Sequence, residues 1–278
     1  MASDLHIHTS FSDGKLSPEE TVKAAKEAGL KCISVTDHDT TEGIVNLYEN
    51  GLYPDKGIKI IPGIEMSANC PGKEVHILGY NIDIYNRALT DRLTEVGESR
   101  WTRFAEIVAK LNELNYRLTE GEVLTIAGDS KSISRSHIAR ALVKRGYFSS
   151  VREAFEVLLD KGKPAYVPHF RLETDEIIAL IKGAGGKVVL AHPKLVKDDV
   201  KVLEIIERGI DGIEVFYPEH DEQDTARYMA FAKEHGLIVT GGSDFHGFTA
   251  RHAVNLGEFT IDDSYAEQFF ADKAEQKG

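Results

Sequence analysis

The sequence predicts an α/β fold in which parallel strands, arranged as a barrel or as an open sheet, are covered by helices. Two observations lead to this expectation. Seven short runs rich in Ile, Val and Leu alternate along the 278 residues with segments that have the hydrophobic period of an amphipathic helix. The runs are also nearly continuous in apolar residues, which is typical of parallel strands buried on both faces.

The predicted strands form two groups, one towards each end of the chain. The first group comprises residues 3–8, 31–37, 58–65 and 74–80, and the second comprises 187–193, 211–218 and 237–244. Each run is short, contains β-branched residues and is followed by polar residues, glycine or proline, which favours a strand over a longer buried helix.

Helices are predicted between several of these strands because their start and stop signals are clear. The segment 17–29 begins with Ser17 as a cap, Pro18 in the first turn and two acidic residues, and it ends at Gly29. The segments 173–185 and 221–236 repeat this scheme and also end on glycine. Strands that alternate with such helices favour a parallel sheet with helices on its faces.

The segment from about 86 to 165 departs from this alternation, because it contains helical patterns and no convincing strand. The patterns cover 87–114, 119–128, 134–146 and 150–162. We therefore expect residues 1–85 and 166–278 to form the barrel domain. Residues 86–165 are expected to form a helical insertion after the fourth strand, placed as a lid.

The composition limits the classes of partner. The net charge of −12 argues against a basic surface that grips long duplex nucleic acid, although a metal centre could still attract a small anionic substrate. The two cysteines, Cys32 and Cys70, are too few for a disulfide framework and fit a reducing compartment. The sequence has no apolar run long enough to cross a membrane, and Asp4 stands where a signal peptide would have a basic and then an apolar run, so none is expected. We expect a cytoplasmic protein with no membrane partner.

Side chains that can bind metals end or follow six of the seven predicted strands. They are His6 and His8 at the first strand, Asp37 and His38 at the second, Glu65 at the third, His76 in the fourth, His192 after the fifth, and Asp244 and His246 after the last. In parallel α/β folds the carboxyl ends of all strands meet at one rim, so these side chains should converge there. One His-x-His pair among 11 histidines carries little weight, whereas the whole set indicates a common site.

Imidazole and carboxylate groups without cysteine suit Zn, Mn or Fe rather than a closed structural zinc site. The candidate ligands are too many for one ion, and they allow two or three ions with a carboxylate as a bridge. Such clusters activate water and hold the oxygens of a phosphoryl group during an in-line displacement. A metal-dependent phosphoesterase is therefore the leading hypothesis.

The sequence resembles the PHP family (polymerase and histidinol phosphatase domain), and in particular its stand-alone phosphoesterases. Four motifs carry the resemblance, namely "HIHTSFSDG" from His6, "TDHD" from Thr36, "AHP" from Ala191 and "SDFH" from Ser243. Glu65 and His76 lie in the expected intervals, and the likeness spans essentially the whole chain. It implies a distorted seven-stranded (β/α) barrel with a helical insertion and a centre for three metal ions.

The resemblance also implies how the ligands are divided among two to three divalent ions (Mn, Zn or Fe). The expected sets are His6, His8, Glu65 and Asp244 for the first ion, Glu65, His76 and His192 for the second, and Asp13, His38 and His246 for the third. The residues expected to act in catalysis are Asp13, His38, Glu65, His192 and His246. Asp37 is expected to orient His38, and Glu214 is expected to have a supporting or structural role.

The insertion contains three candidates for substrate binding. Arg135 and His137 lie at a predicted helix start, where backbone N–H groups and an arginine suit a phosphate, and Lys163 lies just before the chain returns to the barrel. Members of the family that this chain resembles contact substrate phosphate with this segment. Solvated helix charge is the alternative interpretation.

The resemblance implies that a metal-bound hydroxide hydrolyses a small phosphorylated substrate, either a 3′,5′-bisphosphonucleotide or a short oligoribonucleotide attacked from its 5′ end. Two other functions stay open at this point. One is a metabolite phosphomonoesterase of the histidinol phosphatase type, and the other is a metal-binding scaffold without activity. A degenerate scaffold should lack some ligands, and the sequence retains all that can be identified.

Overall fold

The computed structural model describes residues 2–70, 73, 75–247 and 255–275. Its strands are β1 (Ala2–Ile7), β2 (Cys32–Val35), β3 (Lys59–Asn69), β4 (Val75–Tyr80), β5 (Leu172–Glu173), β6 (Lys187–Leu190), β7 (Gly212–Phe216), β8 (Ile238–Gly241) and β9 (Ile261–Asp262). Its helices are α1 (Pro18–Glu27), α2 (Glu42–Glu49), α3 (Arg87–Glu113), α4 (Glu120–Ala127), α5 (Arg135–Lys144), α6 (Val151–Ala154), α7 (Thr174–Gly183), α8 (Asp199–Glu207), α9 (Glu222–His235) and α10 (Ser264–Glu275).

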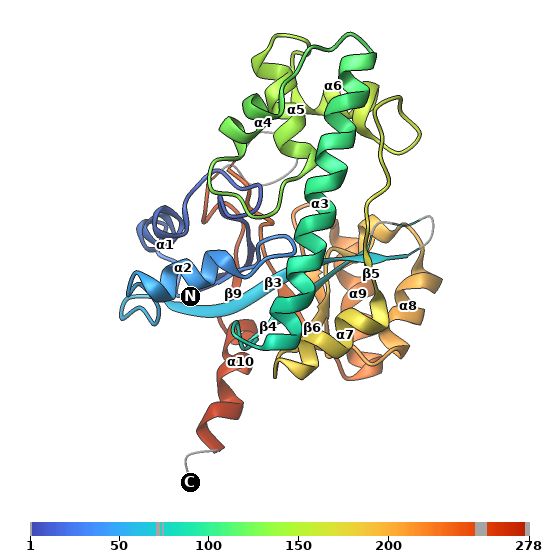
Figure 1. The fold of residues 1–278 in the computed structure, drawn as a ribbon. Helices are drawn as coiled ribbons and strands as arrows, with labels where there is room; N and C mark the ends of the chain where they lie inside the picture. The colour runs from blue at the N-terminus through green and yellow to red at the C-terminus, as the bar shows by residue number, and fades with distance from the viewer. Residues whose placement is uncertain (1, 71–72, 74, 248–254, 276–278) are drawn as a thin grey trace.

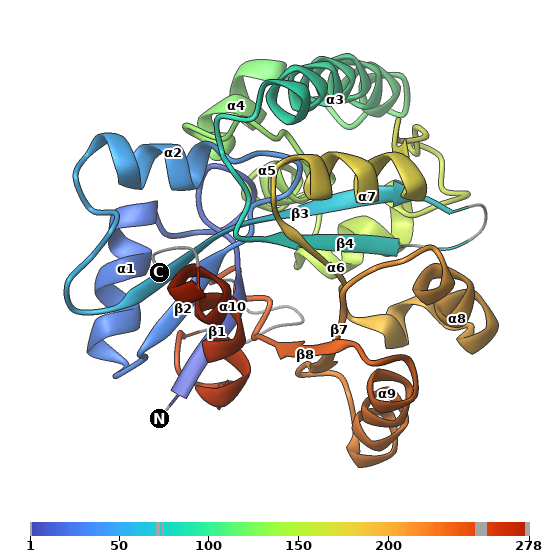
Figure 2. The same cartoon turned by 90° about the horizontal axis from the view of Figure 1, so that it is seen from below.

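The strands form one curved sheet in the order β8-β7-β6-β4-β3-β2-β1-β9, and β5 pairs with the end of β3. An isolated bridge joins Ile7 at the end of β1 to Phe245 in the segment after β8, so the barrel is nearly closed. Helices surround the strands, as the view from below shows (Figure 2). The expected α/β barrel class is therefore confirmed. All seven expected strands are present, together with two additional pairings of only two residues each, β5 and β9.

The expectation of a wholly parallel sheet is wrong for one of the seven expected strands, and the additional strand β9 is also antiparallel to its neighbour β1. β4 runs antiparallel to both of its neighbours, β3 and β6. Only residues 70–74 join β3 to β4, and this connection is too short for the crossover that parallel strands require. The reversal matters for the site, because the start of β4 lies at the rim where β1, β2 and β3 end.

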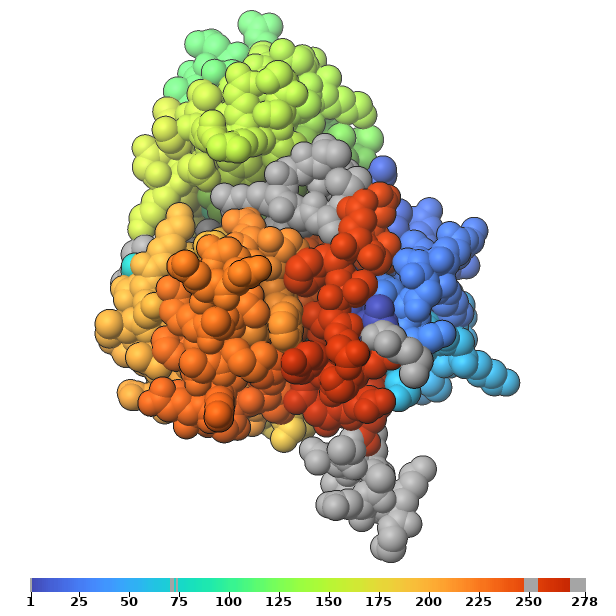
Figure 3. Space-filling model, turned by 180° about the vertical axis from the view of Figure 1, so that it is seen from behind, coloured from blue at the N-terminus to red at the C-terminus, as the bar shows by residue number. Residues whose placement is uncertain are grey.

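The insertion has its own hydrophobic core and is joined to the barrel through α3, which belongs to two cores. The first part of α3 packs on the barrel core through Leu89, Leu93 and Val96. Its later part, from Phe104, packs with α4, α5 and the segment up to Val167 in a separate cluster. Figure 1 shows α3 rising from the barrel, and Figure 3 shows the insertion as a lobe above it.

The end of the barrel away from the insertion is filled by side chains from the strands and from α10, which extends away from the barrel at this end (Figure 1). The ring of Tyr80 packs on Phe269 of α10 with a centroid distance of 4.9 Å, and its hydroxyl donates to the carbonyl of Leu5. In the described part of the chain, no helix has the length and apolar composition of a membrane span.

Candidate metal centre

The end of β1 directs two imidazoles to the rim of the barrel. His6 and His8 are two positions apart and therefore lie on the same side of the extended backbone. Both are completely buried. Their Nε2 atoms lie 3.4 and 3.2 Å from Oε2 of Glu65, which belongs to β3. The same two atoms lie 3.5 and 3.1 Å from Oδ1 of Asp244, which follows β8.

These four residues offer ligand atoms that all lie within 4.8 Å of one another. Three of the atoms, Nε2 of His6, Nε2 of His8 and Oε2 of Glu65, are buried and have no hydrogen-bond partner. Leaving polar atoms buried in this way is costly, so natural proteins rarely do it without a bound group. Atoms that converge while lacking partners fit a metal ion held between them.

A second group of ligand atoms surrounds the other oxygen of Glu65. Its Oε1 lies 2.9 Å from Nδ1 of His76 and 2.9 Å from Nε2 of His192. His76 is near the start of β4, and it reaches the rim because β4 is antiparallel. His38, Glu65 and His76 also meet the spacing for a common ion. Glu65 can thus bridge two ions, with one oxygen directed to each.

A third group combines His8, Asp13, His38 and His246. Oδ1 of Asp13 lies 3.3 Å from Nε2 of His246 and 4.0 Å from Nε2 of His38. The rings of His8 and His246 stack with a centroid distance of 4.1 Å. The structure thus brings all nine sequence-predicted metal ligands to one rim.

The charge of the centre favours a cation. Burial opposes ionisation of Glu65, but His38, His76 and His6 outweigh it and hold the pKa of this carboxyl well below its usual range. Burial likewise opposes protonation of His38, yet Glu65 and Asp13 raise the pKa of His38 to about 10. Carboxylates that hold protons on their neighbours to this extent would hold a divalent cation in their place.

Glu214 supports the ligands from within β7. It is completely buried, and its Oε1 lies 3.0 Å from Nδ1 of His6. Its Oε2 accepts a hydrogen bond of 2.7 Å from the backbone N–H of His192. Carboxylates that contact the second nitrogen of a ligand histidine fix its orientation and tautomer. The sequence signal is a charged residue inside an otherwise apolar strand.

Asp37 does not orient His38 as expected. Its carboxylate instead accepts hydrogen bonds from the backbone N–H of Thr9 at 2.7 Å, from the hydroxyl of Thr9 at 2.7 Å and from the hydroxyl of Ser12 at 2.5 Å. Asp37 therefore fixes the loop that leads from His8 to Asp13. Adjacency in the sequence suggested the other role, but the side chain points to the neighbouring strand.

The predicted substrate residues lie outside the three groups. Arg135 donates to the carbonyl of Leu159 at 3.0 Å, and its guanidinium lies over the rings of Phe155 and Tyr166. His137 is buried, and its Nδ1 accepts a hydrogen bond of 3.1 Å from the backbone N–H of Ser134. The side chain of Lys163 is exposed, and its backbone N–H donates to Asp160.

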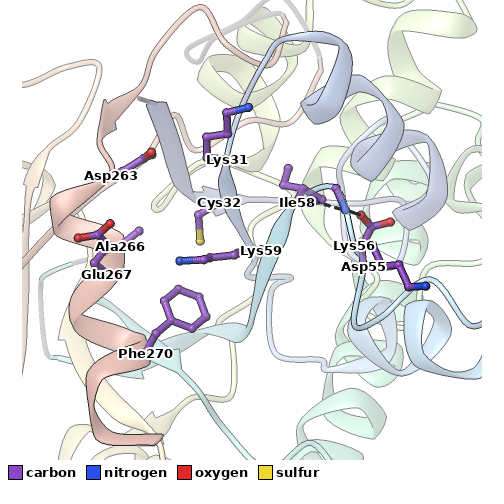
Figure 4. Close-up of a pocket in the computed structure, with 11 residues that line it drawn as sticks. Lys31, Cys32, Asp55, Lys56, Ile58, Lys59, Asp263, Ala266, Glu267 and Phe270 are labelled. Carbon is purple, nitrogen blue, oxygen red and sulfur yellow. Dashed lines mark hydrogen bonds between the residues drawn. The ribbon is translucent and has the colours of Figure 1, made fainter. Parts of the chain in front are cut away.

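A cavity of about 320 Å³ lies at the opposite end of the barrel, beside α10 (Figure 4). Its lining includes Cys32 and Lys59, which begin β2 and β3, and Phe270 of α10. The metal ligands of these two strands lie further along the chain, with His38 after β2 and Glu65 within β3. Burial raises the pKa of the Cys32 thiol to about 12, so this cavity offers no thiolate ligand at neutral pH.

Comparison with known proteins decides the family. The model of the PHP domain matches residues 4–167, which is more than half of the chain. The chain belongs to the PHP domain family. The PHP chain is 34% identical to the 5′-3′ exoribonuclease Rnm of Escherichia coli K12 over 249 residues, covering 87% of this chain and 84% of the relative. It is 32% identical to the 3′,5′-nucleoside bisphosphate phosphatase of Chromobacterium violaceum, with 87% and 86% covered.

The PHP fold is also found in a solved structure of similar sequence. A protein from Bifidobacterium adolescentis, assigned as a metal-dependent phosphoesterase, superposes with a TM-score of 0.87 at 31% identity. The match covers 96% of this chain and 95% of that chain. The superposition includes most of the insertion as well as the barrel, so the lobe above the rim is shared with this PHP protein.

Proposed function

We propose that this PHP protein is a metal-dependent phosphoesterase that binds two to three divalent transition-metal ions, Mn, Zn or Fe, at the rim of its barrel. The observation that carries the proposal is the position of Glu65. Its two carboxylate oxygens lie 2.9–3.4 Å from ring nitrogens of His6, His8, His38, His76 and His192. The full set of proposed ligands is His6, His8, Asp13, His38, Glu65, His76, His192, Asp244 and His246.

The chemistry divides between the ions and the protein. When bound, divalent ions supply positive charge to a phosphoryl group and lower the pKa of water. The protein holds the ligands in place. Glu214 keeps Nε2 of His6 turned to the rim, and the hydroxyl of Tyr217 donates to Oδ2 of Asp244 at 3.2 Å. The residues proposed to act next to the reacting phosphate are Asp13, His38, Glu65, His192 and His246.

Arginine side chains near the junction of insertion and barrel support a substrate with more than one phosphate. Arg100 and Arg103 on α3 are both buried. Burial lowers the pKa of Arg103 to about 9, and the neighbouring guanidinium groups of Arg135 and Arg100 add to this effect. A second substrate phosphate placed near Arg103 and Arg135 would offset their mutual repulsion, whereas Arg100 already pairs with Asp39.

We therefore propose that the substrate is a 3′,5′-bisphosphonucleotide or a short oligoribonucleotide hydrolysed from its 5′ end, in the cytoplasm. The names of the Escherichia coli and Chromobacterium violaceum relatives support both classes. The net charge of −12 favours a small substrate over a long duplex. The alternative is a phosphomonoesterase of the histidinol phosphatase type. This alternative predicts a preference for substrates with one phosphate, whereas the proposed function predicts a preference for substrates with two or more.

The test combines metal analysis with a small substrate panel. The purified protein is assayed before and after exhaustive EDTA treatment and after return of Mn²⁺ or Zn²⁺. Substrates are a 3′,5′-bisphosphonucleotide, a short 5′-phosphorylated oligoribonucleotide, histidinol phosphate and p-nitrophenyl phosphate. We expect hydrolysis of the first two, complete loss with EDTA and recovery with metal. Full activity in metal-free protein would contradict the mechanism, and preference for histidinol phosphate would favour the alternative.

A further inference from the structure

Two loops that carry metal ligands are tied to the insertion rather than to the barrel alone. The first is the loop after β1 that carries Asp13. Oδ2 of Asp13 accepts a hydrogen bond of 3.2 Å from the hydroxyl of Ser134, the N-cap of α5, while Oδ1 faces His246 and His38. The carboxylate therefore has one oxygen directed to the proposed ion and the other held by the insertion.

The same loop makes two further contacts with the segment that leads to Ser134. The hydroxyl of Ser130 donates to the carbonyl of Ser12 at 2.6 Å, next to the ligand. The backbone N–H of Lys131 donates to the carbonyl of Phe11 at 2.9 Å. Ser130, Lys131 and Ser134 of the insertion thus all bond to the ligand loop, the first two through its backbone and Ser134 through the side chain of Asp13.

The second loop follows β2 and carries His38. The next residue, Asp39, is buried and adopts a left-handed backbone conformation with φ of 50°, which is unfavourable for a residue with a side chain. Its Oδ2 pairs with the buried guanidinium of Arg100 on α3, and its Oδ1 accepts from the backbone N–H of Ser67 at 2.9 Å. Arg100 and Ser67 thus hold the side chain of Asp39, the residue that directly follows His38.

The group of His6, His8, Glu65 and Asp244 is supported differently. Its ligands come from β1, from β3 and from the segment after β8. Its supporting hydrogen bonds come from Glu214 in β7 and from Tyr217 directly after β7, both barrel residues. The hydrogen bond from Ser134 of the insertion, by contrast, goes to the ligand side chain of Asp13.

We infer that the insertion is a structural part of one metal site, the one formed by His8, Asp13, His38 and His246. Ser134 and Arg100 act as positioning residues, since Ser134 holds the ligand Asp13 and Arg100 holds Asp39, the residue directly after the ligand His38. Occupancy of this site depends on the docked insertion, whereas occupancy of the site around His6 does not. This inference rests on the metal centre of the proposed function, but it concerns which ion is lost rather than which substrate is cleaved.

The test measures Mn²⁺ binding to metal-free protein by calorimetric titration and by metal analysis, without substrate. Removing a hydrogen bond to a metal ligand typically weakens metal binding 10- to 100-fold. We expect Ser134→Ala to weaken the binding of one Mn²⁺ ion by this factor and to leave the affinities for the other ions unchanged. Ser134→Thr, which keeps the hydroxyl, should restore the lost affinity. Ser150→Ala is the matched control, because Ser150 caps α6 in the same way through the N–H of Glu153.

Double variants identify the ion concerned. Combined with His246→Ala, which removes a ligand of the same site, Ser134→Ala should cause no further loss. Combined with His6→Ala, Ser134→Ala should cause the loss of a second ion besides the one that His6→Ala removes. Arg100→Gln should reproduce the effect of Ser134→Ala, and circular dichroism verifies that this variant is folded. If the buried pair of Arg100 and Asp39 proves essential for folding, Ser134→Ala remains the decisive variant. Unchanged affinities in Ser134→Ala, or equal weakening of every ion, would overturn the inference. A protein that hydrolyses none of the panel but loses one ion in Ser134→Ala would overturn only the proposed function.

Discussion

Oε1 of Glu214 lies 3.0 Å from Nδ1 of His6, and neither side chain is exposed to solvent. This contact leaves Nε2 of His6 as the atom that faces Glu65 and Asp244. The imidazole can therefore bind a metal only through Nε2, with the proton of Nδ1 directed to Glu214. Since Glu214 also holds the backbone of His192, one carboxylate orders ligands on two strands.

We predict that Glu214→Gln weakens the binding of the ion at His6 by 10- to 100-fold while the fold is retained. Glutamine keeps the shape of the side chain but removes the charge that favours the donating Nδ1. Competition with a chromophoric chelator measures the affinity. Glu207→Gln on the exposed face of α8 is the control and should bind metal like the wild type. Wild-type affinity in Glu214→Gln would show that Glu214 is only a packing residue.

His8→Ala and His192→Ala should each abolish hydrolysis without unfolding the protein. His8 contributes to two of the three ligand groups, and His192 contacts Oε1 of Glu65, so each loss affects an ion that Glu65 contacts. Some loss of thermal stability is expected, because the remaining carboxylates lose a partner. Activity, metal content and circular dichroism are compared with those of His235→Ala, an exposed histidine of α9. Activity within tenfold of the wild type would exclude a ligand role.

Arg135→Ala should discriminate between substrates. We expect a cost of about 2–4 kcal/mol in kcat/KM on bisphosphonucleotides and oligoribonucleotides, the scale of one desolvated charged hydrogen bond. Turnover of p-nitrophenyl phosphate, which has no second phosphate, should barely change. Since the guanidinium also lies over Phe155, Phe155→Leu serves as a control that alters this packing and keeps the charge. Equal losses on both substrate types would refute the second-phosphate role.

The protein should become less stable as the pH is lowered, because the native state excludes a proton from His137. Burial lowers the pKa of this histidine to about 4, from an ordinary value of 6.5. Between these values the unfolded chain binds a proton that the native protein excludes, so the stability contributed above pH 6.5 is lost as the pH falls to 4. The loss is at most about 3 kcal/mol, from 1.36 kcal/mol per pKa unit.

Urea unfolding between pH 4 and 7 measures this effect. His137→Gln, whose amide oxygen can still accept from the N–H of Ser134, should show a weaker dependence on pH than the wild type. The two proteins share every other titratable group, so the difference between the two curves isolates His137. Parallel curves would mean that His137 becomes protonated in the native state.

Apart from Asp13, which stands in a polar loop, the ligands could be located from the sequence because they stand in or next to strongly apolar runs. A buried strand fixes where its end must lie, so His6, Glu65 and Asp244 could be placed at one rim without knowledge of their distances. The reversal of β4 was less accessible, although the short connection at 70–74 was a signal for it. β5 and β9 are too short to have any hydrophobic period.

The contacts of the insertion could not be derived from the sequence at all. Ser134 could be expected to cap a helix, but its bond to Asp13 depends on how two loops far apart in the sequence meet. The same holds for Arg100, which lies on a helix face that the pattern alone assigns to solvent or to the insertion core. Side chains that join two packed units carry no periodic signal, because their partners belong to another element.

The bridge between Ile7 and Phe245 also sets the order in which the protein can mature. A ribosome releases β1 to β4 early, and the β3–β4 hairpin involves only near neighbours in the chain, so this part can form soon after it emerges. The metal centre cannot, because Asp244 and His246 lie far beyond β4 in the sequence. Metal loading therefore waits until the segment after β8 has left the ribosome, and the ion is selected from those that the protein encounters at that stage.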